Sequence, residues 1–188
     1  MSRHKSMTRS MVSAAAASDI SGVVITALDQ QRDLAGVLEI AAASFPRPWT
    51  RDMFVEALER APGTRAFVAR SANGLVVAYC VGQMVLDELH VHVVAVGSQW
   101  RQRGLGASLL AFFLHAAGQE NAVTATLEVR QSNVAARRLY EGAGFVRSGV
   151  RPGYYADPVE DALVYWRRRL AGGASERSDD TLGEAPSS

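Results

Sequence analysis

The hydrophobic positions change their spacing along the chain, from an extended period to a helical one and back. Val23-Val24-Ile25 is a short β-branched run that predicts a first strand. Apolar residues three and four positions apart follow in two segments, which predicts two helices, the first ending near Ser44. Asp29 and Thr50 stand where helix N-caps are expected. The chain is therefore expected to begin strand, helix, helix.

Three extended segments come next, at residues 65–70, 75–86 and 89–96. Asn73-Gly74 separates the first two and is a strong signal of a tight hairpin. Segment 75–86 is mostly apolar, so we expect both of its faces to be buried. The Asp87-Glu88 pair is expected to turn the chain into the third strand.

The second half of the chain alternates between helices and strands. A segment rich in Ala, Leu and Phe after residue 104 predicts a helix that ends at Gly118. Val123 to Arg130 alternates, with Val123, Ala125, Leu127 and Val129 on one face, as in a strand that buries one side. Ser132-Asn133 can cap a short helix over 134–142.

Two strands, at 145–150 and 162–168, end the pattern, and Arg151 to Pro158 between them is expected to be a loop. The predicted order is β-α-α-β-β-β-α-β-α-β-β. This order predicts an α/β protein of the mixed α+β kind, with a central mixed sheet and helices on both faces rather than a doubly wound parallel sheet.

Composition limits the classes of function. The chain has 188 residues, 48% of them hydrophobic, which suits one domain with a core of its own. The formal net charge of +1 gives no sign of non-specific nucleic-acid binding. The single cysteine, Cys80, cannot form an internal disulfide, which favours a reducing compartment, and it is expected to be inert packing. No run approaches the roughly 18 apolar residues of a membrane helix.

The two ends differ from the middle. Residues 1–20 are basic and rich in Ala and Ser, and are predicted to be a disordered leader or to start upstream of the true initiator. Residues 171–188 are rich in Gly, Ser and acid and are predicted to be a disordered tail. The folded domain is therefore expected to span residues 21–170.

The segment Arg101-Gln102-Arg103-Gly104-Leu105-Gly106 lies between an apolar strand and a helix. Glycines allow a sharp turn and leave backbone amides uncovered at a helix N-terminus, where the helix dipole favours an anion. The two arginines add positive charge. The segment predicts a phosphate-binding turn, although an ordinary strand-to-helix connection has the same pattern.

The residues in order resemble a known family. Arg101-x-x-Gly104-x-Gly106 after an apolar strand resembles the acetyl-CoA motif of the GNAT acetyltransferase superfamily. The further segments resemble its RimI branch, whose members acetylate the terminal alanine of a small-subunit ribosomal protein. These segments are Phe45-Pro46, Trp49, Val85-Leu86-Asp87-Glu88, Leu127-Glu128-Val129-Arg130, Ser132-Asn133, Leu139-Tyr140-Glu141, Gly144-Phe145, Tyr154-Tyr155 and Glu160-Asp161-Ala162.

The resemblance implies a GNAT fold with acetyl-CoA as co-substrate. Backbone groups of Val94, Ala95 and Val96 would hold the pantetheine arm as an added strand does. The backbone amides of the glycine turn would hold the pyrophosphate, with residues Gln102, Arg103, Gly104, Leu105, Gly106 and Ala107. Asn133 would contact the pantetheine, or serve only as a helix cap.

The resemblance also implies two catalytic roles. Glu128 would take the proton from the amine, directly or through a water, and Tyr140 would give a proton to the sulfur of CoA. From the pattern alone, Glu128 is one more solvated strand residue and Tyr140 a core aromatic residue at the end of a short helix. Their twelve-residue separation matches the family and favours the catalytic interpretation.

The acceptor side of the site is expected to have three walls: Phe45 to Trp49, the Asp87-Glu88 turn and the Tyr154-Tyr155 loop. Family members acetylate an alanine that basic residues follow, and these could be attracted by loop carboxylates, namely Asp87, Glu88, Asp157, Glu160 and Asp161. Each of these carboxylates could equally be a solvated loop charge.

The sequence departs from the RimI pattern at three places. Val93 and Gly153 stand where the family often has Asn, and Gly97-Ser98 where it often has Asp-Pro. Gly153 lies in the expected acceptor loop, which leaves the acceptor open. The alternatives are a GNAT enzyme that acetylates a small amine and a CoA-binding regulatory module without turnover.

His90 and His92, two apart on a strand, could form a metal pair, but no third ligand follows at a recognisable spacing, so no metal is expected. The expected partner is a ribosomal-protein N-terminus, with no direct nucleic-acid or membrane contact. The protein is expected to be a cytoplasmic monomer or weak dimer.

Overall fold

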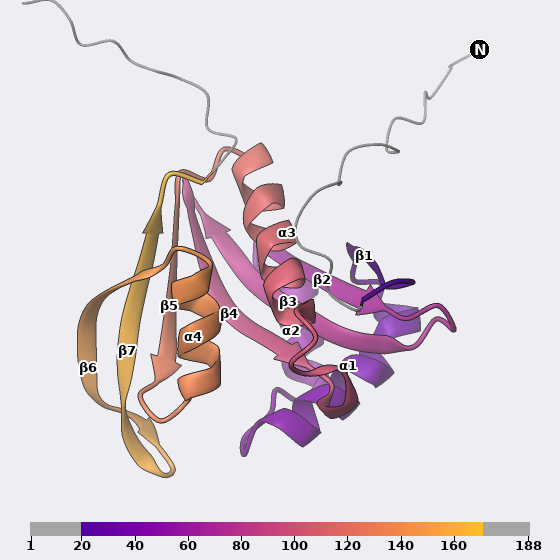
Figure 1. Cartoon of the computed structure of the whole chain (residues 1–188), viewed down its shortest axis with the longest axis horizontal. Coiled ribbons are helices and arrows are strands. Elements are labelled where there is room, and N and C mark those ends of the chain that lie inside the picture. The colour runs from indigo at the N-terminus through magenta and orange to yellow at the C-terminus, as the bar shows by residue number, and fades with distance from the viewer. Residues whose placement is uncertain (1–19, 171–188) are drawn as a thin grey trace, which may run out of the picture.

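The computed structural model describes residues 20–170. Its centre is a seven-stranded sheet in the order β1-β2-β3-β4-β5-β7-β6. Helices α1 and α2 cover one face of the sheet, and α3 and α4 cover the other (Figure 1). The predicted α/β class and the predicted order of elements are both confirmed. The leader over 1–19 and the tail over 171–188 lie outside the described residues.

The elements have the following bounds: β1 Val24–Ala27, α1 Gln30–Ser44, α2 Arg51–Arg60, β2 Thr64–Arg70, β3 Val76–Val85, β4 Glu88–Val96, η1 Ser98–Trp100, α3 Leu105–Gln119, β5 Thr124–Arg130, α4 Val134–Gly142, β6 Val146–Ala156 and β7 Val159–Arg168. Both predicted caps are present. The side chain of Asp29 accepts a hydrogen bond from the Arg32 amide, and Thr50 Oγ1 accepts one from the Met53 amide. The local sequence therefore fixed where α1 and α2 begin.

The opening between β4 and β5 positions the functional site. These two strands are parallel and pair only between Glu88–His90 and Thr124–Thr126, whereas all other neighbouring strands are antiparallel. Beyond residue 90 the two strands diverge, as Figure 1 shows. The edge of β4 that faces β5 is left without a strand partner there, so its backbone groups can bind something else.

Apolar side chains form one core on each face of the sheet. Leu109, Leu110 and Phe113 of α3 belong to one cluster, and Leu34 and Val37 of α1 belong to the other. Residues 77–82 of β3 are all buried, as the apolar run predicted, but Leu75, Val85 and Leu86 at the ends of the predicted strand are exposed. No helix among residues 20–170 has the length and the apolar content needed to cross a membrane.

Two predictions, one for the end of α3 and one for the burial of β5, differ from the structure. Gly118 does not end α3, which continues to Gln119 and buries Gly118 in its last turn. The predicted one-sided burial of β5 is confirmed at Ala125, Leu127 and Val129 but is wrong at Thr126, which is buried and donates a hydrogen bond to the Tyr165 carbonyl. Both faces of the strand are therefore covered at this position, although its pattern predicted one polar face.

The predicted loop from Arg151 to Pro158 is mostly strand. β6 continues to Ala156, and its register with β7 shifts between Arg151 and Tyr155. The Gly153 amide donates a hydrogen bond to Asp161 Oδ1 at 2.8 Å, and Gly153 has a φ of 60°. Glycine and asparagine are the residues that adopt this left-handed conformation most readily, so glycine is a suitable replacement for the family's asparagine.

Candidate active site

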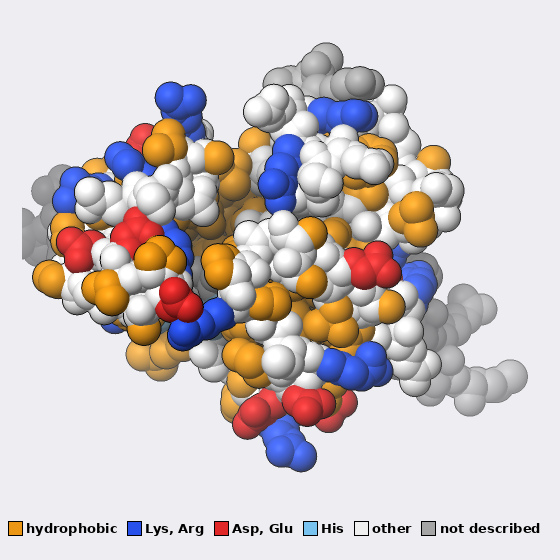
Figure 2. Space-filling view, turned by 90° about the horizontal axis from the view of Figure 1, so that it is seen from below, with side chains coloured by type: hydrophobic (Ala, Val, Ile, Leu, Met, Phe, Trp, Pro, Cys, Tyr) orange, Lys and Arg blue, Asp and Glu red, His pale blue; other side chains and the backbone are white. Residues whose placement is uncertain are grey.

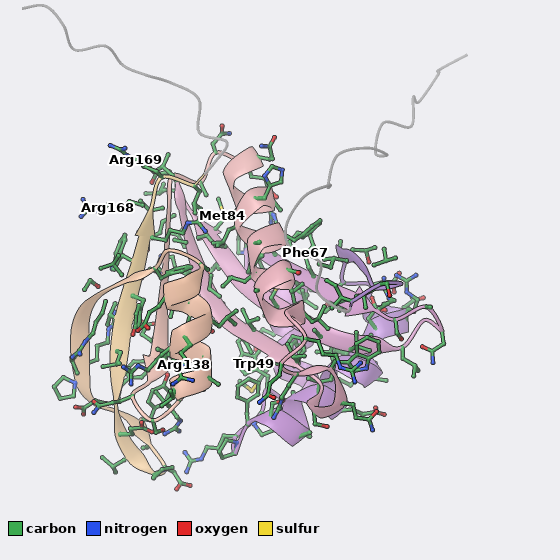
Figure 3. All side chains as sticks on the ribbon, viewed as in Figure 1. Trp49, Phe67, Met84, Arg138, Arg168 and Arg169 are labelled. Carbon is green, nitrogen blue, oxygen red and sulfur yellow. The ribbon has the colours of Figure 1, made fainter. Side chains whose placement is uncertain are left out.

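A cavity of about 220 Å³ lies where β4 and β5 diverge. The face of the molecule in Figure 2 is hollowed between its two sides, and hydrophobic side chains show within the hollow. Figure 3 shows Trp49, which comes from the segment that joins α1 to α2, in the space beside α4. The cavity is lined by Phe45, Arg47, Trp49, Tyr79, His92, Val93, Val94, Glu128, Val129, Arg130, Asn133, Ala136, Tyr140 and Tyr155.

Four residues predicted from the sequence meet in this cavity: Val94 from β4, Glu128 from β5, and Asn133 and Tyr140 from the two ends of α4. They come from three elements that are separate in the chain. Glu128 reaches the cavity because β5 diverges from β4 before that position. The fold therefore brings both candidate catalytic groups to one space.

The Glu128 carboxylate is partly enclosed, with 28% of its side chain exposed. Its Oε1 lies 3.2 Å from Arg151 Nη2, on β6. A half-exposed pair of this kind contributes little to stability, so an incoming amine can compete for the carboxylate. The Glu128 carboxylate is thus accessible from the cavity.

The Tyr140 side chain is buried. Burial raises the pKa of its phenol, and Tyr155 and Cys80 raise it further. The phenol therefore keeps its proton at neutral pH and can donate it. Its ring packs against Phe145 with 5.9 Å between centroids, which fixes its direction.

The turn before α3 has uncovered backbone amides. Gly104 is the N-cap of α3, with a φ of 80°, and no side chain caps the helix there. The amides of Leu105, Gly106 and Ala107 belong to the first turn of the helix, where no intrahelical acceptor exists. This arrangement suits a bound phosphate group, because the amides and the helix dipole both favour an anion.

The two arginines of this turn differ. Arg101 Nε donates to the Val96 carbonyl at 2.9 Å, and Arg101 Nη2 donates to Ser44 Oγ at 3.0 Å. Arg101 therefore ties the end of β4 to α1, and its role toward a phosphate stays a prediction. The Arg103 guanidinium lies 5.5 Å from the centre of the Trp100 ring and is exposed, so it can reach an anion.

The structure shows one of the two roles that the sequence left open for Asn133, the helix cap, and the contact with pantetheine stays a prediction. Asn133 Oδ1 accepts a hydrogen bond from the Ala136 amide at 3.1 Å, which caps α4. The same residue lines the cavity. Because the cap uses only the oxygen, the side-chain NH₂ group is left to meet a ligand.

His92 is a cavity residue whose place the sequence did not predict. The register between β3 and β4 shifts between Val91 and Val93, so His92 is the extra residue of a bulge. A bulge redirects a side chain and breaks the alternation of the strand. The expectation that His90 and His92 share one face depended on that alternation. Burial lowers the pKa of His92, and His90 lowers it further, although Glu128 opposes this. His90 instead contacts Glu88, with 2.7 Å between Nε2 and Oε1.

Metal and thiol chemistry find no support among residues 20–170. No group of three potential metal ligands occurs there. Cys80 is buried, and burial raises the pKa of its thiol. A protonated, buried thiol is a poor nucleophile, in agreement with a packing role.

Two of the three predicted acceptor walls meet at the cavity. Phe45, Arg47 and Trp49 line one side, and Tyr155 lines the other. The third wall is wrong, because Glu88 pairs with Thr124 where β4 and β5 are still joined, whereas the cavity is lined by residues 92–94 of β4. The sequence identified the residues of this turn, but it did not indicate at which end of the sheet the turn lies.

The family pattern described as "Acetyltransferase (GNAT) family" matches residues 34–145. The chain belongs to this family, and it is an acetyltransferase that uses acetyl-CoA as acetyl donor. The match includes the glycine turn, Glu128 and Tyr140, so the site built above lies within the family region.

More particular relatives narrow the comparison. A Bacillus subtilis (strain 168) protein, provisionally named ribosomal protein bS18-alanine N-acetyltransferase, is 34% identical over 134 residues, 71% of this chain and 88% of that protein. The Escherichia coli (strain K12) enzyme named ribosomal protein bS18-alanine N-acetyltransferase is 38% identical over 94 residues, and the match spans 64% of its length.

Solved structures agree with these relatives. The crystal structure of the ribosomal-protein-S18-alanine N-acetyltransferase from Escherichia coli superposes with a TM-score of 0.73 at 30% identity, covering 82% of this chain and 97% of that one. Ard1 from Thermoplasma volcanium gives a TM-score of 0.71 at 29% identity, covering 79% and 99%. The similarity thus extends over nearly the whole described fold.

Proposed function

We propose that this protein is an N-terminal acetyltransferase that transfers the acetyl group of acetyl-CoA to the terminal alanine of ribosomal protein bS18. The observation that carries the proposal is the meeting of Glu128, Asn133 and Tyr140 in one cavity at the mouth of the β4–β5 opening. The relatives whose names specify this reaction support the choice of acceptor.

The donor would lie along the unpaired edge of β4. Val94, Ala95 and Val96 offer backbone groups there, although the Val96 carbonyl already accepts from Arg101. The turn from Gln102 to Ala107 offers amides to the pyrophosphate, and Arg103 adds a positive charge. Asn133 would offer its amide to the pantetheine.

Glu128 would act first, because an α-amino group with a pKa near 8 is mostly protonated at neutral pH. The carboxylate accepts a proton from the terminal ammonium, which frees the nitrogen lone pair to attack the thioester carbon. The new N–C bond forms as the C–S bond breaks, the attacking nitrogen loses its second proton to solvent, and Tyr140 gives its proton to the departing sulfur. Tyr140 then regains a proton from solvent, and Glu128 releases the one that it took.

The first experiment tests the acceptor. The protein is incubated with acetyl-CoA and a synthetic peptide that copies the N-terminus of bS18, and intact mass is read. One added acetyl group at the terminus supports the proposal, and a peptide with a blocked α-amine is the control. Acetylation of small amines alone would show the alternative acceptor class, and CoA binding without any transfer would show a regulatory module.

The acceptor also has consequences for where the protein works. Ribosomal proteins are made in the cytoplasm, so the proposal places the enzyme there. We further propose that residues 21–170 form the catalytic domain and that the protein acts as a monomer or weak dimer, which size-exclusion chromatography with light scattering would test.

A further inference from the structure

The carboxylates that could attract a basic acceptor are not equivalent in the structure. Asp87 lies at the joined end of β4 and β5, away from the cavity. Glu88 is next to it, with its carboxylate on His90. Neither residue can meet a peptide whose terminus lies beside Glu128.

Glu160 and Asp161 are near the site but already hold the hairpin together. Glu160 Oε1 accepts from the Ser132 amide, and Glu160 Oε2 lies 3.2 Å from Arg130 Nη1. These hydrogen bonds lower the pKa of Glu160, the Ser132 amide contributing most. Asp161 Oδ1 accepts from the Gly153 amide, which fixes the bulge of β6. Both carboxylates are therefore committed to structure.

Asp157 differs from the other four carboxylates because its contact is exposed. Asp157 Oδ2 lies 3.0 Å from Arg47 Nη2, with 66% of the Asp157 side chain and 70% of the Arg47 side chain exposed. This contact joins the segment between α1 and α2 to the β6–β7 hairpin, 110 positions later in the chain. An exposed pair gains little net free energy, so another cation can replace Arg47 at small cost.

The position of Asp157 fits the path of an acceptor. Arg47, Asp157 and Tyr155 line a second hollow, and Arg47 and Tyr155 also line the main cavity. The Asp157 carbonyl accepts from Arg130 Nη2 at 3.0 Å, and Arg130 lies two residues after Glu128 on β5. Residues two apart point to the same face of a strand, so Asp157 lies on the side of β5 that Glu128 faces.

We propose that Asp157 is the specificity-determining residue for a basic side chain in the first residues after the acetylated one, and that this side chain displaces the Arg47 guanidinium from the Asp157 carboxylate. The inference rests on the proposed function and names the group that reads the acceptor. Arg47 pairs with the Asp157 carboxylate until a cationic acceptor binds. Peptides without a basic side chain near the N-terminus cannot replace Arg47 there and are therefore poorer substrates.

The test compares two peptides that both begin with alanine. One carries arginines in the positions that follow, and the other carries citrulline there, which has nearly the same shape without the charge. The wild-type protein is expected to show a kcat/KM about two- to fivefold higher for the arginine peptide, the size of one exposed ion pair. Asp157→Asn should bring the ratio close to one, mainly by lowering kcat/KM for the arginine peptide.

Two further variants sharpen the test. Arg47→Gln leaves Asp157 without its internal partner, so the preference for the arginine peptide should rise several-fold. Asp87→Asn removes the same charge at the far end of β4 and should leave the ratio at the wild-type value. Circular dichroism and thermal unfolding confirm that each variant is folded.

The outcomes separate the two proposals. If the wild-type protein acetylates neither peptide but does acetylate small amines, the proposed function fails and the inference fails with it. If both peptides are acetylated but Asp157→Asn changes their kcat/KM values by the same factor, only the role of Asp157 is overturned. A ratio that falls equally in Asp87→Asn also overturns it, because the effect is then one of overall charge.

Discussion

Two arginine–aspartate pairs connect distant segments of this chain, and they differ in almost every physical respect. Asp33 of α1 and Arg70 of β2 are buried, with 1% and 10% of their side chains exposed. Two guanidinium nitrogens of Arg70 contact the two Asp33 oxygens, and the Asp29 amide also donates to Asp33 at 2.7 Å. Arg47 and Asp157, at the mouth of the site, share one exposed contact.

The difference shows how one pair of residue types can serve two purposes. Removing one partner of a buried pair leaves an uncompensated charge in the interior, so the Asp33–Arg70 pair is fixed. At the surface, water replaces a lost partner, so the Arg47–Asp157 pair can exchange. The Glu128–Arg151 pair in the cavity is intermediate in exposure.

The largest predicted effect is on folding. Arg70→Met leaves Asp33 buried without its main partner and should lower the free energy of unfolding by about 3–5 kcal/mol, as measured by urea denaturation. The matched change at the surface, Arg47→Met, should lower it by less than about 1 kcal/mol. Equal losses in the two variants would mean that burial does not distinguish the pairs.

The next effect is on chemistry in the cavity between these regions. Tyr140→Phe should reduce kcat by about 100-fold, the usual range for one proton-transfer group, with little change in CoA affinity. Glu128→Gln should reduce kcat/KM by at least about 100-fold for the same reason. Single-turnover kinetics measure the rate of acetyl transfer, and calorimetric titration measures the affinity for CoA. A variant whose rate of acetyl transfer is unchanged would show that the substituted residue does not have the proposed catalytic role.

A smaller effect is expected from the intermediate pair. Arg151→Met should change the free energy of unfolding by less than about 1 kcal/mol, because the Arg151 side chain is mostly exposed. The variant should instead raise the steady-state rate of acetylation, because it frees the Glu128 carboxylate for the acceptor. A loss of stability as large as that expected for Arg70→Met would show that the Glu128–Arg151 pair behaves as a buried pair.

The pH dependence of folding gives the smallest signal. Burial alone would raise the pKa of Asp33, but hydrogen bonds, first from Arg70 and then from the Asp29 amide, outweigh it and lower the pKa from 3.8. As the pH falls, the Asp33 carboxylate is therefore protonated at a higher pH in the unfolded chain than in the folded protein. The contribution to stability is therefore present above pH 3.8 and is lost as pH falls through the lower folded value. Urea midpoints measured between pH 5 and 3 should fall in the wild-type protein and fall by less in Asp33→Asn, where the lowered pKa of Glu160 still contributes.

Much of the fold could be predicted because the relevant forces are local. Asp29 and Thr50 cap helices within four residues of themselves, and the middle of the apolar run of β3 is buried as expected. The errors came where distant segments decide. Thr126 is buried although the sequence pattern places it on the polar face of β5, and β6 extends past Arg151 through pairing with β7 and a hydrogen bond from the Gly153 amide to Asp161.

The sequence by itself determined the order of elements and the glycine turn before α3, because periodicity and short motifs are properties of neighbouring residues. Its resemblance to the family, and not the local pattern, pointed to the candidate residues Glu128, Asn133 and Tyr140. Only the tertiary structure decided which of these groups meet, since the divergence of β4 and β5 depends on the whole sheet. It also assigned Arg101 to Val96 and Asp157 to Arg47. Side chains 110 positions apart leave no periodic trace in a sequence, and their burial, which decides whether a charge is fixed or exchangeable, is set by what packs around them.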